Sequence, residues 1–346
     1  MKKLLSAFLA LTLIMSLGIP AFAASIEEGI GVLCDGFVYG EGPETDGLSI
    51  DYRYFSPVKE NDTVKYPLVV WLHGMGNGSS EGVQVTASNV SYWASDEFQA
   101  RFTNGGAFIL AARSDELKGV CWNEGTIAPL KAAIDDFIAK NKNNIDLTRI
   151  YIGGYSMGGK MTLKMAVAYP EMFAAAFPIC PAWSPSESTL ELIADMPIWL
   201  TSGVTDPLVN YFFSVSKTWE KLSAVSENPA ENRFSTLKKV CYEDGKKTMS
   251  AHHSWYAVNH DMFSDENGAY PHMTTVNGLG ETVTLTYPDG MISWLCSHTS
   301  DYNGEASTGK GNLENIKNDD SMVGTTDIFD FFRTLFTAIK SLFSLM

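Results

Sequence analysis

Apolar runs and amphipathic stretches alternate along the chain, and this alternation predicts the fold. Residues 66–72 form an almost continuous apolar run, which is typical of a strand buried on both faces of a parallel sheet. Similar strands are expected at 107–113, 149–153, 173–180, 197–203 and 233–242. Helical periodicity lies between these runs at 127–141, 160–168 and 211–222. The order strand, helix, strand predicts an α/β protein with a mostly parallel, doubly wound sheet and helices on both faces.

The flanking segments have different patterns. Residues 31–39 and 48–55 predict two strands of a half-exposed edge hairpin, because the second alternates between apolar and polar positions. Residues 259–289 form a Gly-rich insertion, and 290–295 predict a closing helix. His272 lies in the insertion and His298 follows the closing helix, so we expect both on the surface.

The first residues predict export. Lys2 and Lys3 precede an apolar stretch over 4–17, and Ala21-Phe22-Ala23 fits a signal-peptidase site. We therefore assign residues 1–23 to a signal peptide and expect a secreted, extracellular protein, cut after Ala23 or Ala24. A retained N-terminal anchor is the alternative.

The pattern changes again after the α/β domain, which we place at residues 24–300. Residues 301–325 are rich in Gly, Asn, Asp, Ser and Lys and predict a flexible linker. Residues 326–346 predict an amphipathic helix that begins at Asp327 and gathers its Ile, Leu and Phe side chains on one face. Such a helix either docks on the domain or makes a peripheral contact with a membrane or a partner, and we favour the second.

The amino-acid composition limits the kind of protein and the partners to be expected. Of the 346 residues, 45% are hydrophobic and 19% charged, which is typical of a globular protein with a core. The net charge of −15 argues against nucleic acid as a partner. The five cysteines of the mature chain have no metal-binding spacing, and we expect no metal and no cofactor. Of these, Cys121 and Cys180 are the pair to test first for a disulfide; the full set is Cys34, Cys121, Cys180, Cys241 and Cys296.

The chemistry centres on a Gly-x-Ser-x-Gly sequence at 154–158, between the strand at 149–153 and the helix at 160–168. Such a turn holds Ser156 at a sharp corner, with its hydroxyl exposed at the top of the sheet. The helix then points its N-terminus at the reaction centre. We interpret Ser156 as a nucleophile, against the alternative of an ordinary Gly-rich turn.

A second glycine-rich loop follows the strand at 66–72. His73-Gly74-Met75-Gly76 lets backbone N–H groups approach a substrate carbonyl, so it predicts half of an oxyanion hole. We name Met75 and Met157 as the two backbone donors. His73 is expected to brace this loop and not to act as a base.

An acid and a base follow Ser156 in the order that a catalytic triad needs. Asp206 comes after the strand at 197–203, and His252 comes after the last core strand. Asp206-Pro207 is also a good turn initiator, which leaves a structural role open for Asp206. His253 and His260 compete with His252, which we prefer.

These motifs resemble a known family. Similarity to secreted α/β-hydrolase esterases, in the peptidase/esterase group near feruloyl esterases and polyhydroxybutyrate depolymerases, is found in the runs 66–76, 149–159, 169–180 and 197–209 and in the motif His252-x-x-Trp255. The resemblance covers about residues 48–297. It departs from the family at Ala251, where a glycine is usual, and in the long insertion.

The resemblance implies the α/β-hydrolase fold and a secreted serine carboxylesterase that forms an acyl-enzyme through Ser156, His252 and Asp206. It implies feruloyl or acetyl esters of plant polysaccharide as substrates. Alternatives are polyester or lipid esters, a serine peptidase, and a non-catalytic binding protein.

Tryptophans lie on loops near the expected site. Trp122, Trp183 and Trp255 are candidates for substrate binding, and Trp183 resembles the aromatic clamp of cutinase-like polyester hydrolases. Trp93 lies on another such loop. Each of the four is equally well explained by packing in the core.

Overall fold

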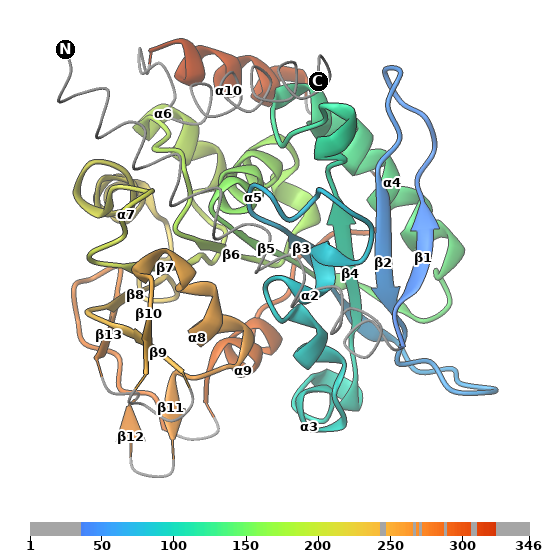
Figure 1. Ribbon diagram of the computed structural model, residues 1–346, viewed down its shortest axis with the longest axis horizontal. Coiled ribbons are helices and arrows are strands. Elements are labelled where there is room, and N and C mark those ends of the chain that lie inside the picture. Colours follow the sequence, from blue (N-terminus) through green and yellow to red (C-terminus); the bar gives the residue numbers. More distant parts are fainter. Residues whose placement is uncertain are drawn as a thin grey trace, which may run out of the picture.

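A central β-sheet organises the chain in the computed structural model (Figure 1). The structure describes residues 36–242, 247–265, 268–269, 272–286, 289–305 and 310–322. Within these residues, nine strands form one sheet, in the spatial order β1-β2-β4-β3-β5-β6-β7-β8-β13. The strands are β1 (Val38–Glu41), β2 (Asp51–Phe55), β3 (Tyr66–Leu72), β4 (Phe108–Arg113), β5 (Ile145–Tyr155), β6 (Ala175–Ile179), β7 (Trp199–Gly203), β8 (Arg233–Leu237) and β13 (Met273–Asn277).

The six strands from β4 to β8 in this order pair in parallel, as predicted. The edge strands are antiparallel: β1 pairs with β2, β2 with β4, and β13 with β8. The order reverses at β3, because the chain first adds β4 on one side and then β5 on the other. In open α/β sheets, a ligand crevice forms at the carboxyl ends of the strands beside such a reversal. The ends of β3 and β5 are therefore where a site is expected.

Helices cover both faces of the sheet (Figure 1). One layer packs in the core with Leu68, and its helices are α4 (Ile127–Lys140), α5 (Met157–Ala168), α6 (Glu187–Leu190), α7 (Ser216–Val225) and α10 (Lys310–Met322). The opposite layer packs in the core with Val69, and its helices are α2 (Val83–Thr86), α3 (Asp96–Gln99), α8 (Trp255–Asn259) and α9 (Met291–Cys296). Two short antiparallel pairs lie outside the large sheet: β9 (Val240–Cys241) with β10 (Thr248–Met249), and β11 (Ser264–Asp265) with β12 (Gly268–Ala269).

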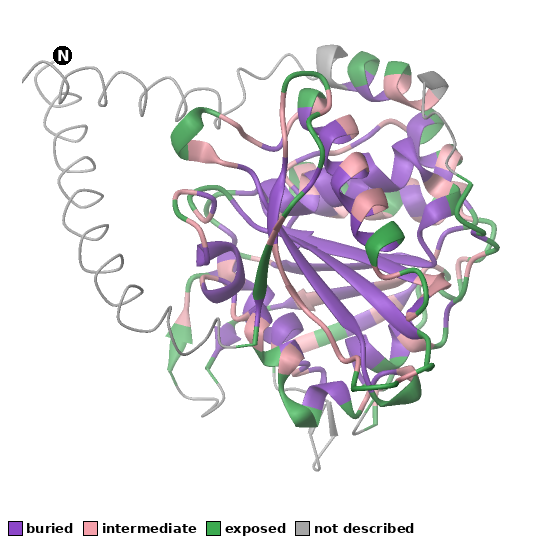
Figure 2. Cartoon of the chain, turned by 90° about the vertical axis from the view of Figure 1, so that its right-hand side faces the viewer, coloured by how far each residue is buried: buried purple, intermediate pink, exposed green. Residues whose placement is uncertain are grey.

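Strand β3 shows why the sheet is buried on both sides. Its side chains alternate between the two layers: Leu68 and Val70 join one core, while Val69 and Trp71 join the other. All four are fully buried. Figure 2 shows the central strands buried along their length, with exposed residues at the periphery. The almost continuous apolar run at 66–72 follows from this two-sided burial.

Two expectations about the later part of the chain were wrong. The strand expected at 233–242 is not the last core strand, because the insertion at 259–289 contributes strand β13. This strand extends the sheet and pairs Thr275 with Ser235, whose hydroxyls are 2.7 Å apart. His298 is buried and not on the surface, with its ring 4.7 Å from that of Trp294. An antiparallel edge strand needs only one apolar face, which makes its apolar signal weak.

The predicted linker at 301–325 also needs correction, because residues 310–322 form helix α10. Ile316 is fully buried, and Leu313 packs against the same core. The Asp319 carboxylate accepts a hydrogen bond from the Ser186 backbone N–H at 2.7 Å, just before α6. The polar composition reflects a helix that exposes most of its surface and buries a narrow stripe.

The predicted signal peptide (1–23) and the predicted amphipathic helix (326–346) lie outside the described residues. Among the helices that the structure does describe, none combines the length and the apolar character needed to cross a membrane.

Candidate active site

Ser156 lies at the sharp turn between β5 and α5, beside the reversal of the sheet order. Its backbone has φ of 58° and ψ of −115°, an uncommon conformation for a residue other than glycine. The turn is so close to β3 that a Cβ on Gly158 would overlap the Leu72 carbonyl. The glycine is therefore required by the close approach of strand and helix, as the Gly-x-Ser-x-Gly pattern predicts.

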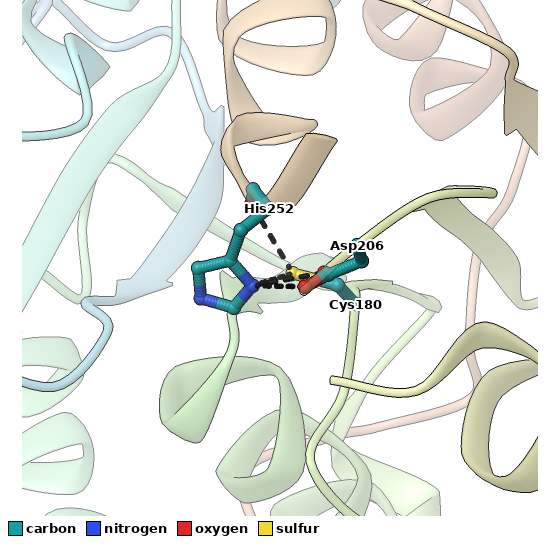
Figure 3. Close-up of side chains that lie close together, drawn as sticks. All are labelled: Cys180, Asp206 and His252. Carbon is teal, nitrogen blue, oxygen red and sulfur yellow. Dashed lines mark hydrogen bonds and ion pairs between the residues drawn. The ribbon is translucent and has the colours of Figure 1, made fainter. Parts of the chain in front are cut away.

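Asp206 and His252 come together beyond the ends of their strands. Asp206 lies three residues after β7, and His252 lies in the 3-10 turn Ala251–His253. The two carboxylate oxygens of Asp206 are 2.9 and 3.1 Å from His252 Nδ1 (Figure 3). The His252 ring is 5.9 Å from the ring of Tyr155, the residue before Ser156, so it lies close to the serine turn. Acid, base and nucleophile candidates therefore share one corner of the molecule.

Asp206 also stabilises the turn that follows it, in addition to contacting His252. Its Oδ1 accepts hydrogen bonds from the backbone N–H groups of Leu208 and Val209, at 2.8 and 2.9 Å. Its Oδ2 is the oxygen nearer to His252. These two backbone bonds hold the carboxylate in place, because a buried anion needs donors around it.

The competing histidines have other surroundings. His260 stacks on Tyr256 with ring centroids 4.1 Å apart, and its Nε2 is 3.1 Å from Asn89 Nδ2. Burial lowers the pKa of His253, and the nearby His252 lowers it further. Among the described residues, His252 is the histidine that contacts Asp206.

His73 braces the glycine-rich loop after β3. It is fully buried, its Nδ1 is 2.7 Å from the Gly74 carbonyl, and its Nε2 accepts a hydrogen bond from the Ser114 N–H at 3.1 Å. Burial lowers the pKa of His73 to about 4. The ring is therefore neutral at pH 7, with Nδ1–H as donor, and its bonds tie the loop to the end of β4.

Trp122 holds the same loop, because its Nε1–H donates a hydrogen bond to the His73 carbonyl at 3.0 Å.

Within the described part of the chain, the backbone N–H groups of Met75 and Met157 are unpaired. Neither donates a hydrogen bond to an acceptor among the residues that the structure describes. Met157 is the first residue of α5, where the N–H groups of a helix are left unpaired. Both N–H groups are therefore available to a substrate oxygen, and their role as an oxyanion hole stays a prediction.

Glu116 is a residue that sequence reasoning missed. Its carboxylate accepts a hydrogen bond from the Gly76 N–H, 2.9 Å from each oxygen, and so holds the loop that carries Met75. Burial raises the pKa of Glu116 to about 7, against the opposing effect of the backbone N–H groups of Gly76 and Gly78. No local motif marks this glutamate, since it lies 40 residues from the glycine it binds.

The tryptophans are less exposed than a stacking platform would be. Trp122, Trp183 and Trp255 are 2%, 5% and 8% exposed, and Trp93 is fully buried. Trp93 donates to the Asn259 carbonyl, which explains it as a core residue. The indole N–H groups of Trp183 and Trp255 are buried with no acceptor among the described residues. A role of these two in substrate binding stays a prediction.

Ala251 occupies the position where the resembled family usually has glycine, and the structure shows how it fits. A Cβ on Gly203, at the end of β7, would overlap the Ala251 carbonyl and lie 2.8 Å from the Ala251 side chain. The glycine on β7 therefore provides the space for the turn that carries His252. The departure at Ala251 leaves the contact between His252 and Asp206 intact.

Cys180 is the unexpected neighbour of this pair. Its sulfur is 3.8 Å from His252 Nδ1 and 3.6 Å from the His252 carbonyl. Cys180 and Cys121 form no disulfide with each other, so that prediction was wrong. Burial lowers the pKa of His252, but its contacts with Cys180 and Asp206 outweigh burial and raise this pKa above its ordinary value.

The arrangement fits nucleophilic acyl transfer. Donation from His252 Nδ1–H to Asp206 fixes the tautomer in which Nε2 is free to accept a proton. The strained serine turn, the anchored Asp206–His252 pair and two unpaired backbone N–H groups are the parts that this chemistry needs.

Known proteins share this framework. Residues 123–259 match the phospholipase/carboxylesterase family. A structure of a thermostable esterase is 31% identical, with a TM-score of 0.55, and covers 66% of this chain; this chain spans 61% of that esterase. A structure of Est1E from Butyrivibrio proteoclasticus is 19% identical, with a TM-score of 0.41, and covers 58% of this chain and 88% of its own.

An acylaminoacyl peptidase in complex with a chloromethyl ketone is also similar, at 16% identity and a TM-score of 0.44, covering 66% of this chain and 41% of the peptidase. No curated protein sequence matches the chain. With its parallel sheet, its serine turn between β5 and α5 and its match over residues 123–259 to the phospholipase/carboxylesterase family, the chain has the α/β-hydrolase fold.

Proposed function

We propose that the protein is a serine hydrolase that cleaves carboxylic esters through Ser156, His252 and Asp206. The observation that carries this proposal is the contact of 2.9 Å between His252 Nδ1 and Asp206, beside the strained turn of Ser156. A lone serine turn is a common feature of α/β proteins. An anchored carboxylate–imidazole pair next to it is the arrangement that activates a serine hydroxyl.

In the proposed reaction, His252 Nε2 takes the Ser156 proton while Oγ attacks the ester carbonyl carbon. The N–H groups of Met75 and Met157 bind the oxygen of the tetrahedral intermediate. His252 then gives the proton to the leaving alcohol, which departs and leaves an acyl-enzyme on Ser156. Water, deprotonated by the same histidine, hydrolyses the acyl-enzyme and restores the serine.

For the substrate we propose feruloyl or acetyl esters of plant polysaccharide, as the resemblance implies. The surface near Asp206 supports an apolar acyl group, because Leu208, Phe212 and Phe213 are 49%, 62% and 81% exposed just after it in the chain. Exposed apolar side chains in one segment are typical of binding surfaces. Hydrolysis rates on feruloyl, acetyl-xylan and polyester substrates would test this choice, and a preference for polyester would contradict it.

We further propose that the protein is exported and that residues 326–346 make a peripheral membrane or partner contact. Both proposals rest on the sequence patterns at the two ends. N-terminal sequencing of the secreted protein should give a first residue of 24 or 25. Removal of residues 326–346 should reduce membrane association, and unchanged association would contradict the second proposal.

The proposed activity is tested by Ser156→Ala. We expect hydrolysis of p-nitrophenyl acetate to fall by about 10⁴-fold or more, because the nucleophile is removed. Ser188→Ala, on the exposed start of α6, is the matched control and should keep the full rate. An aminoacyl-anilide measured in parallel separates an esterase from a peptidase. Full ester hydrolysis by Ser156→Ala would contradict the assignment.

A further inference from the structure

Three side chains with different metal-binding atoms converge beside the serine turn (Figure 3). Cys180 Sγ, an Asp206 carboxylate oxygen and His252 Nδ1 all lie within 4.8 Å of one another. They come from the ends of β6 and β7 and from the turn Ala251–His253, and all three are buried. A thiolate, an imidazole and a carboxylate are the ligands that Zn²⁺ takes in proteins.

The spacing of these atoms suits a single ion. Nδ1 lies 2.9 Å from Asp206 Oδ2 and 3.8 Å from Cys180 Sγ. Tetrahedral zinc bonds of about 2.0 to 2.3 Å place neighbouring ligand atoms roughly 3.2 to 3.6 Å apart. The two distances to Nδ1 therefore need to change by only a few tenths of an ångström, while Sγ and the carboxylate oxygen, which lie within 4.8 Å of each other, would move together until they reach this range. Solvent would supply a fourth ligand.

The surroundings already orient two of the ligands. Asp206 Oδ1 is occupied by the N–H groups of Leu208 and Val209, which leaves Oδ2 to bind the metal. The Cys180 backbone has φ of 35° and its N–H donates to the Thr201 carbonyl at 2.8 Å. Outer bonds of this kind fix ligand direction and raise metal affinity.

We propose that this cluster is an inhibitory site for Zn²⁺ and similarly thiophilic divalent cations; the inhibition rests on the proposed hydrolase function. On binding, the Cys180 thiol loses its proton to solvent and the neutral imidazole moves its proton from Nδ1 to Nε2. The metal takes the lone pair that Nδ1 then exposes. Nε2 now carries a proton and cannot accept one from Ser156, so the general base is lost without any change in Ser156.

The same ligands define which ions act. A thiolate favours Zn²⁺ or Cd²⁺ over Mg²⁺ and Ca²⁺, which prefer oxygen ligands.

The test uses the full chain and measures binding separately from catalysis. Hydrolysis of p-nitrophenyl acetate is followed after incubation with buffered free Zn²⁺, with Mg²⁺ in parallel, and again after EDTA. We expect Zn²⁺ to lower the rate at least tenfold, EDTA to restore it and Mg²⁺ to have no effect. Cys180→Ala is compared with its own metal-free rate, because Cys180 contacts His252, and Zn²⁺ should lower that rate by less than about twofold. Cys296→Ala, which alters a cysteine in α9 outside the cluster, should be inhibited like the wild type.

Metal binding is read directly with Co²⁺, whose bond to a thiolate gives a charge-transfer absorption band. The band should appear in the wild type and in Ser156→Ala, and it should be absent in Cys180→Ala. A band in a protein without ester hydrolysis would support the site while contradicting the proposed function. Equal inhibition of Cys180→Ala and wild type, or no band in the wild type, would overturn the proposed site.

Discussion

At the scale of residues, the two carboxylate oxygens of Asp206 have different partners. Oδ1 is fixed by two backbone N–H groups, and Oδ2 faces His252 Nδ1. The side chain is fully buried, so its charge acts on the imidazole in surroundings of low dielectric constant. A structural role and the proposed catalytic role thus coincide in one carboxylate.

Because the two oxygens have different partners, the effect of Asp206→Asn can be predicted. The Asn Oδ1 can still accept the Leu208 and Val209 N–H groups, so the fold should persist. Its NH₂ group would face Nδ1 and favour the wrong imidazole tautomer. We expect kcat for p-nitrophenyl acetate to fall by about 10³- to 10⁴-fold. Asp195→Asn, at an exposed carboxylate, is the control and should have no effect. A loss of less than tenfold would show that Asp206 does not orient His252.

The lowered pKa of His73 predicts that the stability of the folded protein depends on pH. Its folded pKa of about 4 is below the ordinary value of 6.5, so the unfolded chain binds the proton more readily. The stabilisation is therefore complete above about pH 6.5 and is lost as the pH falls towards 4. The loss amounts to at most about 3 kcal/mol. Urea unfolding at pH 7 and pH 4 should show a smaller difference for His73→Asn than for the wild type. An equal difference would mean that His73 does not contribute.

At the scale of elements, α10 shows how a polar segment can belong to the fold. It lies against α5 and α6, where Asn312 donates to the Val167 carbonyl at 2.8 Å and Asp319 accepts from the Ser186 N–H. Figure 1 shows it running along the outside of that helical layer. Its single buried stripe stabilises the helix through tertiary packing and not through helix propensity.

The packing of α10 is tested by Ile316→Ala. Because Ile316 is fully buried, its truncation should lower the free energy of unfolding by about 2 to 5 kcal/mol. Lys317→Ala, at the next and exposed position, should change it by less than about 0.5 kcal/mol. Urea midpoints measure both variants, and identical midpoints would show that α10 does not add to the stability of the domain.

At the scale of the whole molecule, the parallel sheet and the positions of Ser156, Asp206 and His252 at strand ends were predictable from the sequence. Long two-sided burial leaves continuous apolar runs, and the serine turn needs its glycines, so both are visible locally. Glu116 was missed, and the contact of Cys180 with His252 was not predicted, because these contacts span 40 and 72 residues. Strand β13 and helix α10 bury only one face. His298 packs against Trp294, and its carbonyl accepts a hydrogen bond from Tyr151, 147 residues away, a contact that the local sequence does not reveal.

Covalent labelling of Ser156, the proposed nucleophile, is the sharpest test of the proposed hydrolase. The full-length protein is treated with a fluorophosphonate, and the modified peptide is located by tandem mass spectrometry. We predict one adduct, on Ser156, which is absent from Ser156→Ala and formed much more slowly by His252→Ala. Labelling of another serine, or equal labelling of Ser156→Ala, would contradict the account.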